Sequence, residues 1–284
     1  MSHLGHYLLH SVAGGDALLF MKAKTELLLY HLLWTTEALF RPTFRNLNQS
    51  FEGWAYKNGF LPQIHRLEAQ GFLEANRSAL DRSRFVRLTE AGRVAALGGR
   101  DPEQAWSVPW DGKWRLFLFD IPVTDQALRK QIHRALADCG CGCLQGSVWI
   151  SPHLPAGTGR FFAERGEDCS HLMMLESGSR GMQVDARMVQ AAWSFPRINE
   201  RYQQHIEILD RLPVPARYSS RALLDRALLD WSKLENQAWL DAVRRDPLLP
   251  SALLPTDYLG TKAWKKRRAV LPRAMRLLAQ HQEK

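Results

Sequence analysis

The run WRLFLF at residues 114–119 constrains the fold more than any other stretch, because it is apolar at nearly every position. A strand with one wet face alternates apolar and polar residues, whereas a strand covered on both faces does not. Pro122 ends this strand, and residues 123–139 predict a helix. The middle of the chain must therefore contain a sheet whose faces are covered by other elements.

The segments that follow alternate between strand and helix. Glycines interrupt the predicted helix before a second strand at residues 147–150, which Pro152 stops. A strand at residues 172–175 and a helix from Asp185 continue the pattern. This order predicts a ferredoxin-like βαββαβ unit.

The N-terminal third predicts a winged helix-turn-helix. Residues 22–40 contain neither Gly nor Pro and carry a broad apolar surface, and residues 43–54 suit a second helix. Pro62 fits the first turn of a third helix, and Gly71 fits its C-terminal cap. Two short strands joined by an arginine-rich stretch then predict a hairpin, after which Thr89 caps another helix.

This arrangement suits DNA, because a helix fills the major groove and basic side chains of a wing reach phosphates or the minor groove. The candidates are polar residues on and just before the third helix, together with the arginines of the hairpin. They are Lys57, Asn58, Gln63, His65, Arg66, Arg77, Arg82 and Arg84. The alternative is a winged helix used only for protein contacts, and the arginine cluster argues against it.

The last third predicts an all-α region. One helix covers residues 196–212, and Ser219 or Ser220 caps a longer helix that runs to about Arg245. A final helix carries four consecutive basic residues at 265–268. Because consecutive side chains point all round a helix, a solvated face is the alternative to contact with DNA or with ligand phosphates.

The 284 residues carry a formal net charge of +9, divided as +4 over residues 1–100, −2 over residues 101–195 and +7 over residues 196–284. We predict a domain for each segment, and the basic ends indicate a polyanionic partner. The 24% charged content argues against disorder and the four cysteines against a disulfide scaffold. No apolar run approaches the roughly 20 residues that span a bilayer, so we expect a cytoplasmic protein.

Two motifs carry a family resemblance. WDGKWRLFLFDIP at residues 110–122 and GSVWISP at 146–152 closely resemble the central domain of the PaaX-type transcriptional repressors, which regulate phenylacetate degradation. RRDPLLPSALLPTDYLGTKA at residues 244–263 is similar to the last domain of that family. The resemblance covers essentially the whole chain. It implies an α+β, multidomain, homodimeric repressor that binds double-stranded DNA and is released by an acyl-CoA effector, typically phenylacetyl-CoA.

The central domain also resembles the small ferredoxin-like nucleases of CRISPR spacer acquisition, in which an Asp after the first strand helps to hold a divalent metal. Asp120 matches that position, so the alternative function is a metal-dependent nuclease. Such a site normally needs several carboxylates, and no second acidic residue recurs in a recognisable motif. We therefore expect no metal, and interpret Asp120 as a cap of the following helix or as part of a domain interface.

The cysteines raise a zinc alternative. Zinc sites favour Cys-x₂₋₄-Cys pairs, and the Cys-x-Cys-x-Cys pattern here departs from that spacing, which favours small buried thiols instead. The residues concerned are Cys139, Cys141 and Cys143, with Cys169, His153 or His171 as further ligands. The chain also lacks a P-loop and a Gly-x-Ser-x-Gly elbow, so we predict neither a cofactor nor an enzymatic activity.

The chain contains ten tryptophans, which is many for its length. Most should lie in the core, but an aromatic-lined pocket between the central and C-terminal domains would suit an aryl-acyl group. The effector-binding candidates near that junction are Trp193, Tyr202, Trp231 and Trp239.

Overall fold

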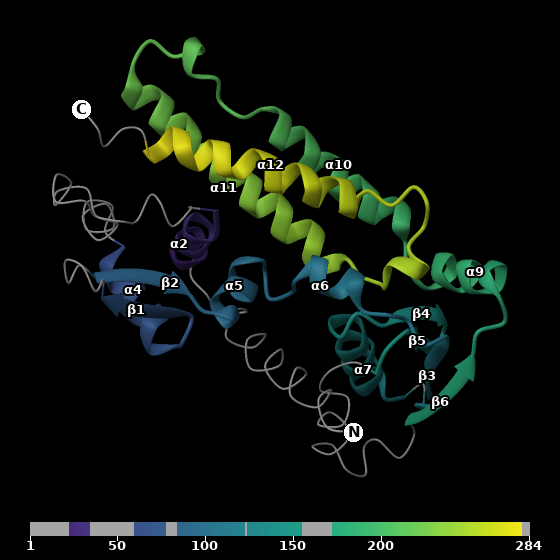
Figure 1. Cartoon of the computed structure of the whole chain (residues 1–284). Helices are drawn as coiled ribbons and strands as arrows, with labels where there is room; N and C mark the ends of the chain where they lie inside the picture. Colours follow the sequence, from purple (N-terminus) through teal and green to yellow (C-terminus); the bar gives the residue numbers. More distant parts are fainter. Residues whose placement is uncertain (1–22, 35–59, 78–83, 123, 155–171, 280–284) are drawn as a thin grey trace. The chain divides into compact units, whose positions relative to one another are not determined.

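The computed structural model describes residues 23–34, 60–77, 84–122, 124–154 and 172–279, and Figure 1 labels its elements. Contacts between residues group the chain into two compact units. The N-terminal unit contains residues 1–100, 202–241 and 260–284, and the central unit contains residues 101–201 and 242–259.

Helices and one hairpin make up the first part of the N-terminal unit. They are helix α2 (Ala23–Trp34), helix α4 (Leu61–Ala69), strands β1 (Leu73–Arg77) and β2 (Arg84–Leu88), and helix α5 (Glu90–Ala96). The strands pair antiparallel, with Leu73 opposite Leu88 at one end and Arg77 opposite Arg84 at the other. The second helix predicted at residues 43–54 lies outside the described residues, so the winged helix as a whole stays a prediction.

The residues predicted to begin or end the helices of this region do so. Pro62 lies in the first turn of α4, and Gly71 beyond the end of that helix has a φ of 73°, a conformation that glycine adopts without strain. The Oγ1 of Thr89 accepts a hydrogen bond from the Gly92 amide at 3.0 Å and so caps α5. The predicted boundaries of the third helix and of α5 are therefore confirmed.

A four-stranded antiparallel sheet forms the centre of the second unit. Its strands are β3 (Lys113–Phe119), β4 (Gly142–Gln145), β5 (Val148–Ser151) and β6 (Leu172–Gly178). The order β4-β5-β3-β6 is that of a ferredoxin-like sheet. Helix α7 (Gln126–Asp138) joins β3 to β4, and α9 (Met182–Ala192) follows β6. The short strand β4 was not predicted, and residues 155–171 lie outside the described part.

Strand β3 is covered unevenly. Phe117 and Phe119 are buried in a cluster with residues of α7, which includes Ile132. On the opposite face Trp114 is buried, and its indole donates to the Oδ1 of Asp185 in α9 at 2.8 Å. Farther along that face the described leucines are only half-buried. The prediction of a strand covered on both faces is thus confirmed at Trp114 and corrected beyond it.

Long helices fill most of the last third. They are α10 (Phe195–Asp210), α11 (Arg221–Arg245) and α12 (Gly260–Ala279), with single turns η4 (Pro215–Arg217) and η5 (Ser251–Leu253), and α6 (Pro102–Ser107) precedes β3. Ser220 caps α11 by accepting from the Leu223 amide at 3.4 Å. The two units divide inside α10 and α11, so the three consecutive domains and the all-α third domain stay predictions. No helix in the described part is long and apolar enough to cross a membrane.

A buried cluster of charged side chains lies among the helices of the N-terminal unit. Arg267 of α12 and Glu235 of α11 are fully buried, and the Arg267 Nε donates to the Glu235 Oε1 at 2.8 Å. The His205 Nε2 of α10 lies 2.7 Å from the same oxygen. Burial opposes the charge on Glu235, but Arg267 and His205 outweigh it and hold the pKa of Glu235 at about 2. The carboxylate is therefore ionised at any physiological pH.

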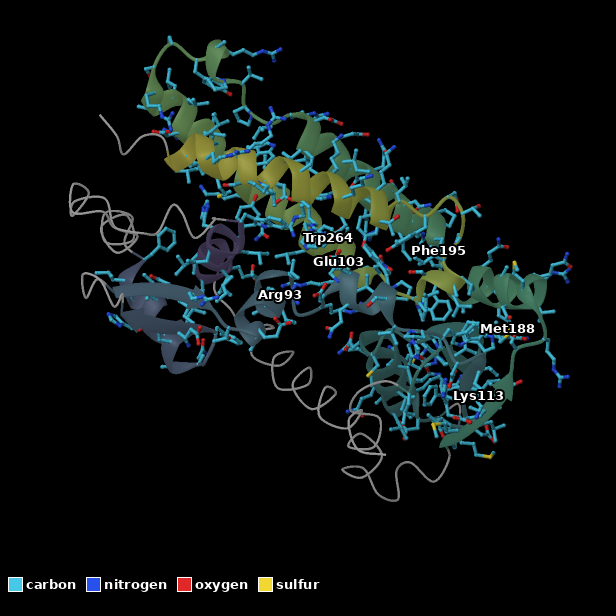
Figure 2. All side chains as sticks on the ribbon, viewed as in Figure 1. Arg93, Glu103, Lys113, Met188, Phe195 and Trp264 are labelled. Atoms are coloured by element: carbon cyan, nitrogen blue, oxygen red, sulfur yellow. The ribbon has the colours of Figure 1, made fainter. Side chains whose placement is uncertain are left out.

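Aromatic rings enclose the buried arginine. Its guanidinium carbon lies 4.4 Å from the ring centroid of Trp239, 5.2 Å from that of Trp34 and 5.7 Å from that of Tyr30. Trp264, labelled in Figure 2, packs edge-on against Trp34 at 5.9 Å between ring centroids. Because Tyr30 and Trp34 belong to α2, the cluster joins that helix to the helices of the last third.

This burial predicts a loss of stability in acid. His31 of α2 is buried, and burial lowers its pKa from 6.5 to about 4. A folded-state pKa below the unfolded value means that the stabilisation is present above pH 6.5 and is lost as the pH falls toward 4. Burial also lowers the pKa of His205, in the same direction. The free energy of unfolding should therefore fall by about 3 kcal/mol or more between pH 7 and pH 4.

Urea unfolding followed by tryptophan fluorescence at both pH values measures this loss. His31→Leu removes one titrating group and should flatten the pH dependence. An unchanged dependence in that variant would show that His31 is not responsible.

Candidate nucleic-acid interface

Helix α4 presents the polar residues that were predicted to meet DNA. Ile64 and Leu67 on one side of the helix are buried in the core of the unit. His65 and Arg66 on the other side are exposed, and Gln63 is half-buried. Since an imidazole and a guanidinium both donate hydrogen bonds, this side of α4 offers donors to phosphate oxygens and base edges.

The exposed histidine of α4 has an acidic neighbour on its own helix. The side chain of His65 is 64% exposed, and its Nδ1 lies 3.6 Å from the Glu68 Oε2. At that distance the contact is loose, and both groups are separated by a single turn of helix. The His65 side chain is thus exposed and makes only this loose contact with its own helix.

The β1–β2 hairpin places two arginines opposite each other. In the antiparallel register Arg77 pairs with Arg84, at the end where the chain continues into residues 78–83. The register thus brings two basic positions of the chain to the same end of the hairpin.

Close packing fixes the hairpin against its flanking elements. The Thr89 hydroxyl donates to the Gly71 carbonyl at 2.7 Å, which ties the end of β2 to the turn before β1. A Cβ on Gly92 would lie 2.0 Å from the Phe72 carbonyl oxygen, so only glycine permits this approach of α5. The Trp239 indole of α11 donates to the Leu97 carbonyl at 3.3 Å. Helix α4 and the hairpin therefore sit on a rigid support.

The structure brings some predicted DNA contacts together and leaves others undescribed. Gln63, His65 and Arg66 share one short helix, and Arg77 and Arg84 share one rung of the adjoining hairpin. The remaining candidates, Lys57, Asn58 and Arg82, lie outside the described residues.

The four aromatic effector candidates do not lie in one unit. Trp193 belongs to the central unit, where its ring packs over Gly142 and its indole donates to the Gly140 carbonyl at 3.3 Å. The other three belong to the N-terminal unit and are buried there. The ring centroids of Tyr202 and Trp239 lie 6.2 Å apart, and the Trp231 indole donates to a backbone carbonyl of α10. Within each unit these rings serve as core, and their role in effector binding stays a prediction.

The predicted capping role of Asp120 is wrong. Helix α7 begins at Gln126, so its N-cap is Asp125, whose Oδ1 accepts from the Leu128 amide at 3.0 Å. Asp120 is exposed directly after β3. In the described part of the chain no group of three or more His, Cys, Asp or Glu side chains is placed to hold a metal ion. No described cluster therefore favours the nuclease alternative.

The cysteines differ in their surroundings. Cys141 is buried, and burial raises the pKa of its thiol to about 12, whereas Cys139 is exposed. Cys143 is half-buried, with its thiol 3.8 Å from the Gly146 carbonyl. The buried-thiol interpretation thus fits Cys141, while Cys169 and His171 lie outside the described residues.

Sequence reasoning missed the buried charges that hold α2 in place. The basic run at residues 265–268 was interpreted as a surface feature, yet Arg267 is fully buried and Lys266 pairs with Asp210 at 2.5 Å. Glu235 and Arg267 are 32 positions apart, so no local pattern could have connected them. The only local signal was that four consecutive helical residues cannot all face solvent.

Two comparisons with known proteins support the resemblance found in the sequence. Residues 107–189 match the family described as "PaaX protein central Cas2-like domain". The chain is 24% identical over 219 residues to the "Transcriptional repressor PaaX" of Escherichia coli (strain K12), covering 75% of this chain and 67% of that protein. A solved structure, "Uncharacterized protein Rv0674 from Mycobacterium tuberculosis", is 18% identical with a TM-score of 0.49, and the match covers 90% of this chain and 97% of that one.

Proposed function

We propose that this chain, a PaaX-type family member, is a transcriptional repressor that binds double-stranded DNA through α4 and the β1–β2 hairpin. The observation that carries the proposal is the exposed donor pair His65 and Arg66 on a firmly packed helix, next to a hairpin rung with two opposed arginines. Helix α4 enters the major groove, and the hairpin contacts the flanking phosphates. Such a protein acts in the cytoplasm as a regulator and not as an enzyme.

Charge reversal on α4 tests this interface. Arg66→Glu replaces a donor by a like charge facing the phosphates, and should weaken binding to the DNA upstream of the chain's own gene at least tenfold. Fluorescence anisotropy at fixed salt measures the dissociation constant on that DNA and on a scrambled duplex. Arg187→Glu, an exposed position in α9, makes the same charge change elsewhere and should leave the affinity close to wild type. Equal affinity for the scrambled duplex would refute specific repression.

We propose that the repressor is a homodimer joined through the central sheet. On the face of β6 that carries Met173 and Leu175, both side chains are more than half exposed. They lie opposite Leu118 and Leu116 of β3, which are half-buried, so one sheet face presents a continuous apolar strip. A two-fold dimer buries the same strip on both copies, and it also matches an operator with two half-sites.

A lysine in that strip should separate the copies. Met173→Lys places a charge in the proposed interface, and it should shift the protein to monomer in sedimentation velocity and weaken operator binding. Met182→Lys is the matched control, because Met182 is 84% exposed on α9 and lies outside the strip. If Met173→Lys stays dimeric, the dimer uses another surface.

We also propose that an acyl-CoA releases the repressor from DNA, as the family resemblance implies. A ligand that binds only the folded state raises the melting temperature, so phenylacetyl-CoA should do so while free coenzyme A does so less. The same thioester should lower the affinity for operator DNA in the anisotropy assay. Equal effects of phenylacetyl-CoA and free coenzyme A would mean that the acyl group is not recognised.

A further inference from the structure

The N-terminal unit contains a cavity of about 560 Å³ beside α12. Its lining residues are distant in sequence from the residues proposed to contact DNA. Three segments line it: the end of α10, the proline-bearing connection that leads into η4, and the second half of α12. The lining residues are Leu209, Asp210, Leu212, Pro213, Val214, Pro215, Val270, Arg273, Arg276 and Leu277. The volume lies within the range of small-molecule sites.

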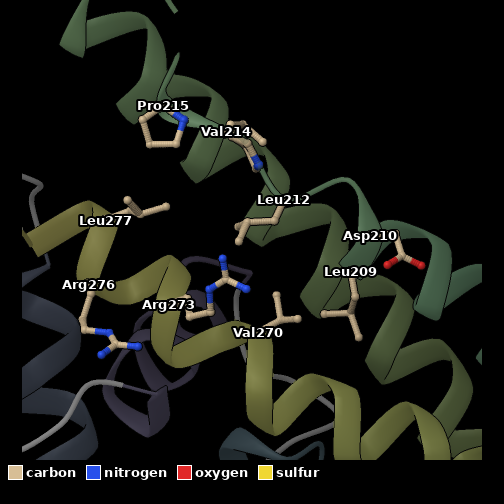
Figure 3. A pocket seen from close by; sticks show the side chains of 10 residues that line it. Leu209, Asp210, Leu212, Val214, Pro215, Val270, Arg273, Arg276 and Leu277 are labelled. Atoms are coloured by element: carbon tan, nitrogen blue, oxygen red, sulfur yellow. The ribbon is translucent and has the colours of Figure 1, made fainter. Parts of the chain in front are cut away.

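Leucine, valine and proline side chains form much of the cavity wall, and an arginine side chain extends from α12 into the space. Leu212, Val270 and Leu277 point toward the same space in Figure 3, and the Arg273 guanidinium extends from α12 into it. Arg276, one turn farther along α12, is turned away from that space. The cavity therefore combines a hydrophobic surface with two arginines of α12, of which Arg273 extends into the space.

The acidic residue that lines the cavity has a partner other than Arg273. Asp210 is the acidic residue of the lining, and its carboxylate already pairs with Lys266 at 2.5 Å. Within the described residues the Arg273 side chain makes no ion pair or hydrogen bond. A guanidinium with free donors beside an apolar wall binds a carboxylate or phosphate in two parallel hydrogen bonds.

We propose that this cavity binds an amphipathic anion, a molecule with an apolar body against the leucine and valine walls and a carboxylate or phosphate on Arg273. Prolines at positions 213 and 215 fix the backbone opposite α12, so the site is largely formed before the ligand arrives. The binding claim is independent of DNA. Only its regulatory consequence rests on the proposed repressor function.

The cavity shares its wall with the core that holds α2. Leu209, Leu212 and Val270 belong to the apolar cluster that also contains Tyr30 of α2. Helix α2 in turn contacts α4 and β2, which are among the elements proposed to bind DNA, and it also contacts α5. A ligand that repacks these residues changes the free energy of the arrangement on which α4 rests. Operator affinity should therefore change when the cavity is filled.

Calorimetric titration of the full chain without DNA tests the site. The probes are octanoate, octyl phosphate and uncharged octanol, which share one apolar chain and differ in the head group. At least one anion should bind, at least tenfold more tightly than octanol, and the tighter anion identifies the head group. Arg273→Ala should weaken that binding at least tenfold, whereas Arg226→Ala, an exposed arginine of α11 outside the lining, should not. Absence of anion binding, or wild-type affinity in Arg273→Ala, overturns the proposal.

A second variant distinguishes binding inside the cavity from binding to an arginine on the surface of α12. Val214→Trp keeps Arg273 but fills the space beside it, and Val214 is exposed enough for the fold to tolerate the change, which circular dichroism verifies. The anion should then bind at least tenfold more weakly. Unchanged binding would place the anion on the surface of α12 and refute a cavity site.

The regulatory consequence has its own measurement. If the anion lowers operator affinity by some factor, the operator must lower anion affinity by the same factor, because linkage is reciprocal. Equal factors in the two titrations support a coupled site. An operator affinity that is the same with and without the bound anion refutes the coupling. Because the calorimetric titration contains no DNA, a failure of the proposed repressor function would leave the binding result intact.

Discussion

The buried pair of Arg267 and Glu235 is the constraint on which the N-terminal unit depends. Taking two charges out of water costs several kcal/mol per ion, and only good geometry with further hydrogen bonds offsets that cost. Here the geometry comes from three helices, because Glu235 also contacts His205 of α10. Removing either partner would leave an uncompensated charge, at a cost of roughly 3–5 kcal/mol. The helices of the last third can therefore pack together in one register only.

The same arginine explains why α2 belongs with the last third of the chain. Its guanidinium lies over rings of Tyr30 and Trp34, which come from α2, as well as over Trp239. Helix α2 is also part of the core that carries α4 and the hairpin. The elements proposed to bind DNA and the helices around the cavity consequently belong to one folded unit.

Sequence reasoning succeeded where a single residue decides a local conformation. Pro62, Gly71 and Thr89 predicted the limits of α4 and α5, because each has a direct effect on backbone geometry or on unpaired amides. It failed where the position of a side chain depends on residues that are distant in the sequence. The N-cap of α7 is Asp125 because six residues separate the end of β3 from the first residue of the helix. The pairing of Glu235 with Arg267, and the cavity charge left on Arg273, depend on three-dimensional packing that no spacing encodes.

The packing of the N-terminal unit also limits how an effector could act. A packed core does not deform continuously, so a ligand beside Leu209 and Leu212 can act only by favouring one of two discrete arrangements of the helices. The buried charge pair makes arrangements that separate α11 from α12 very costly, so the change must leave that pair intact. A change that leaves the pair intact must instead involve the packing of α2 against the cluster that contains Leu271 and Met275, because α2 also contacts α4. The size of any effect on DNA binding is then bounded by the difference in ligand affinity between those two arrangements.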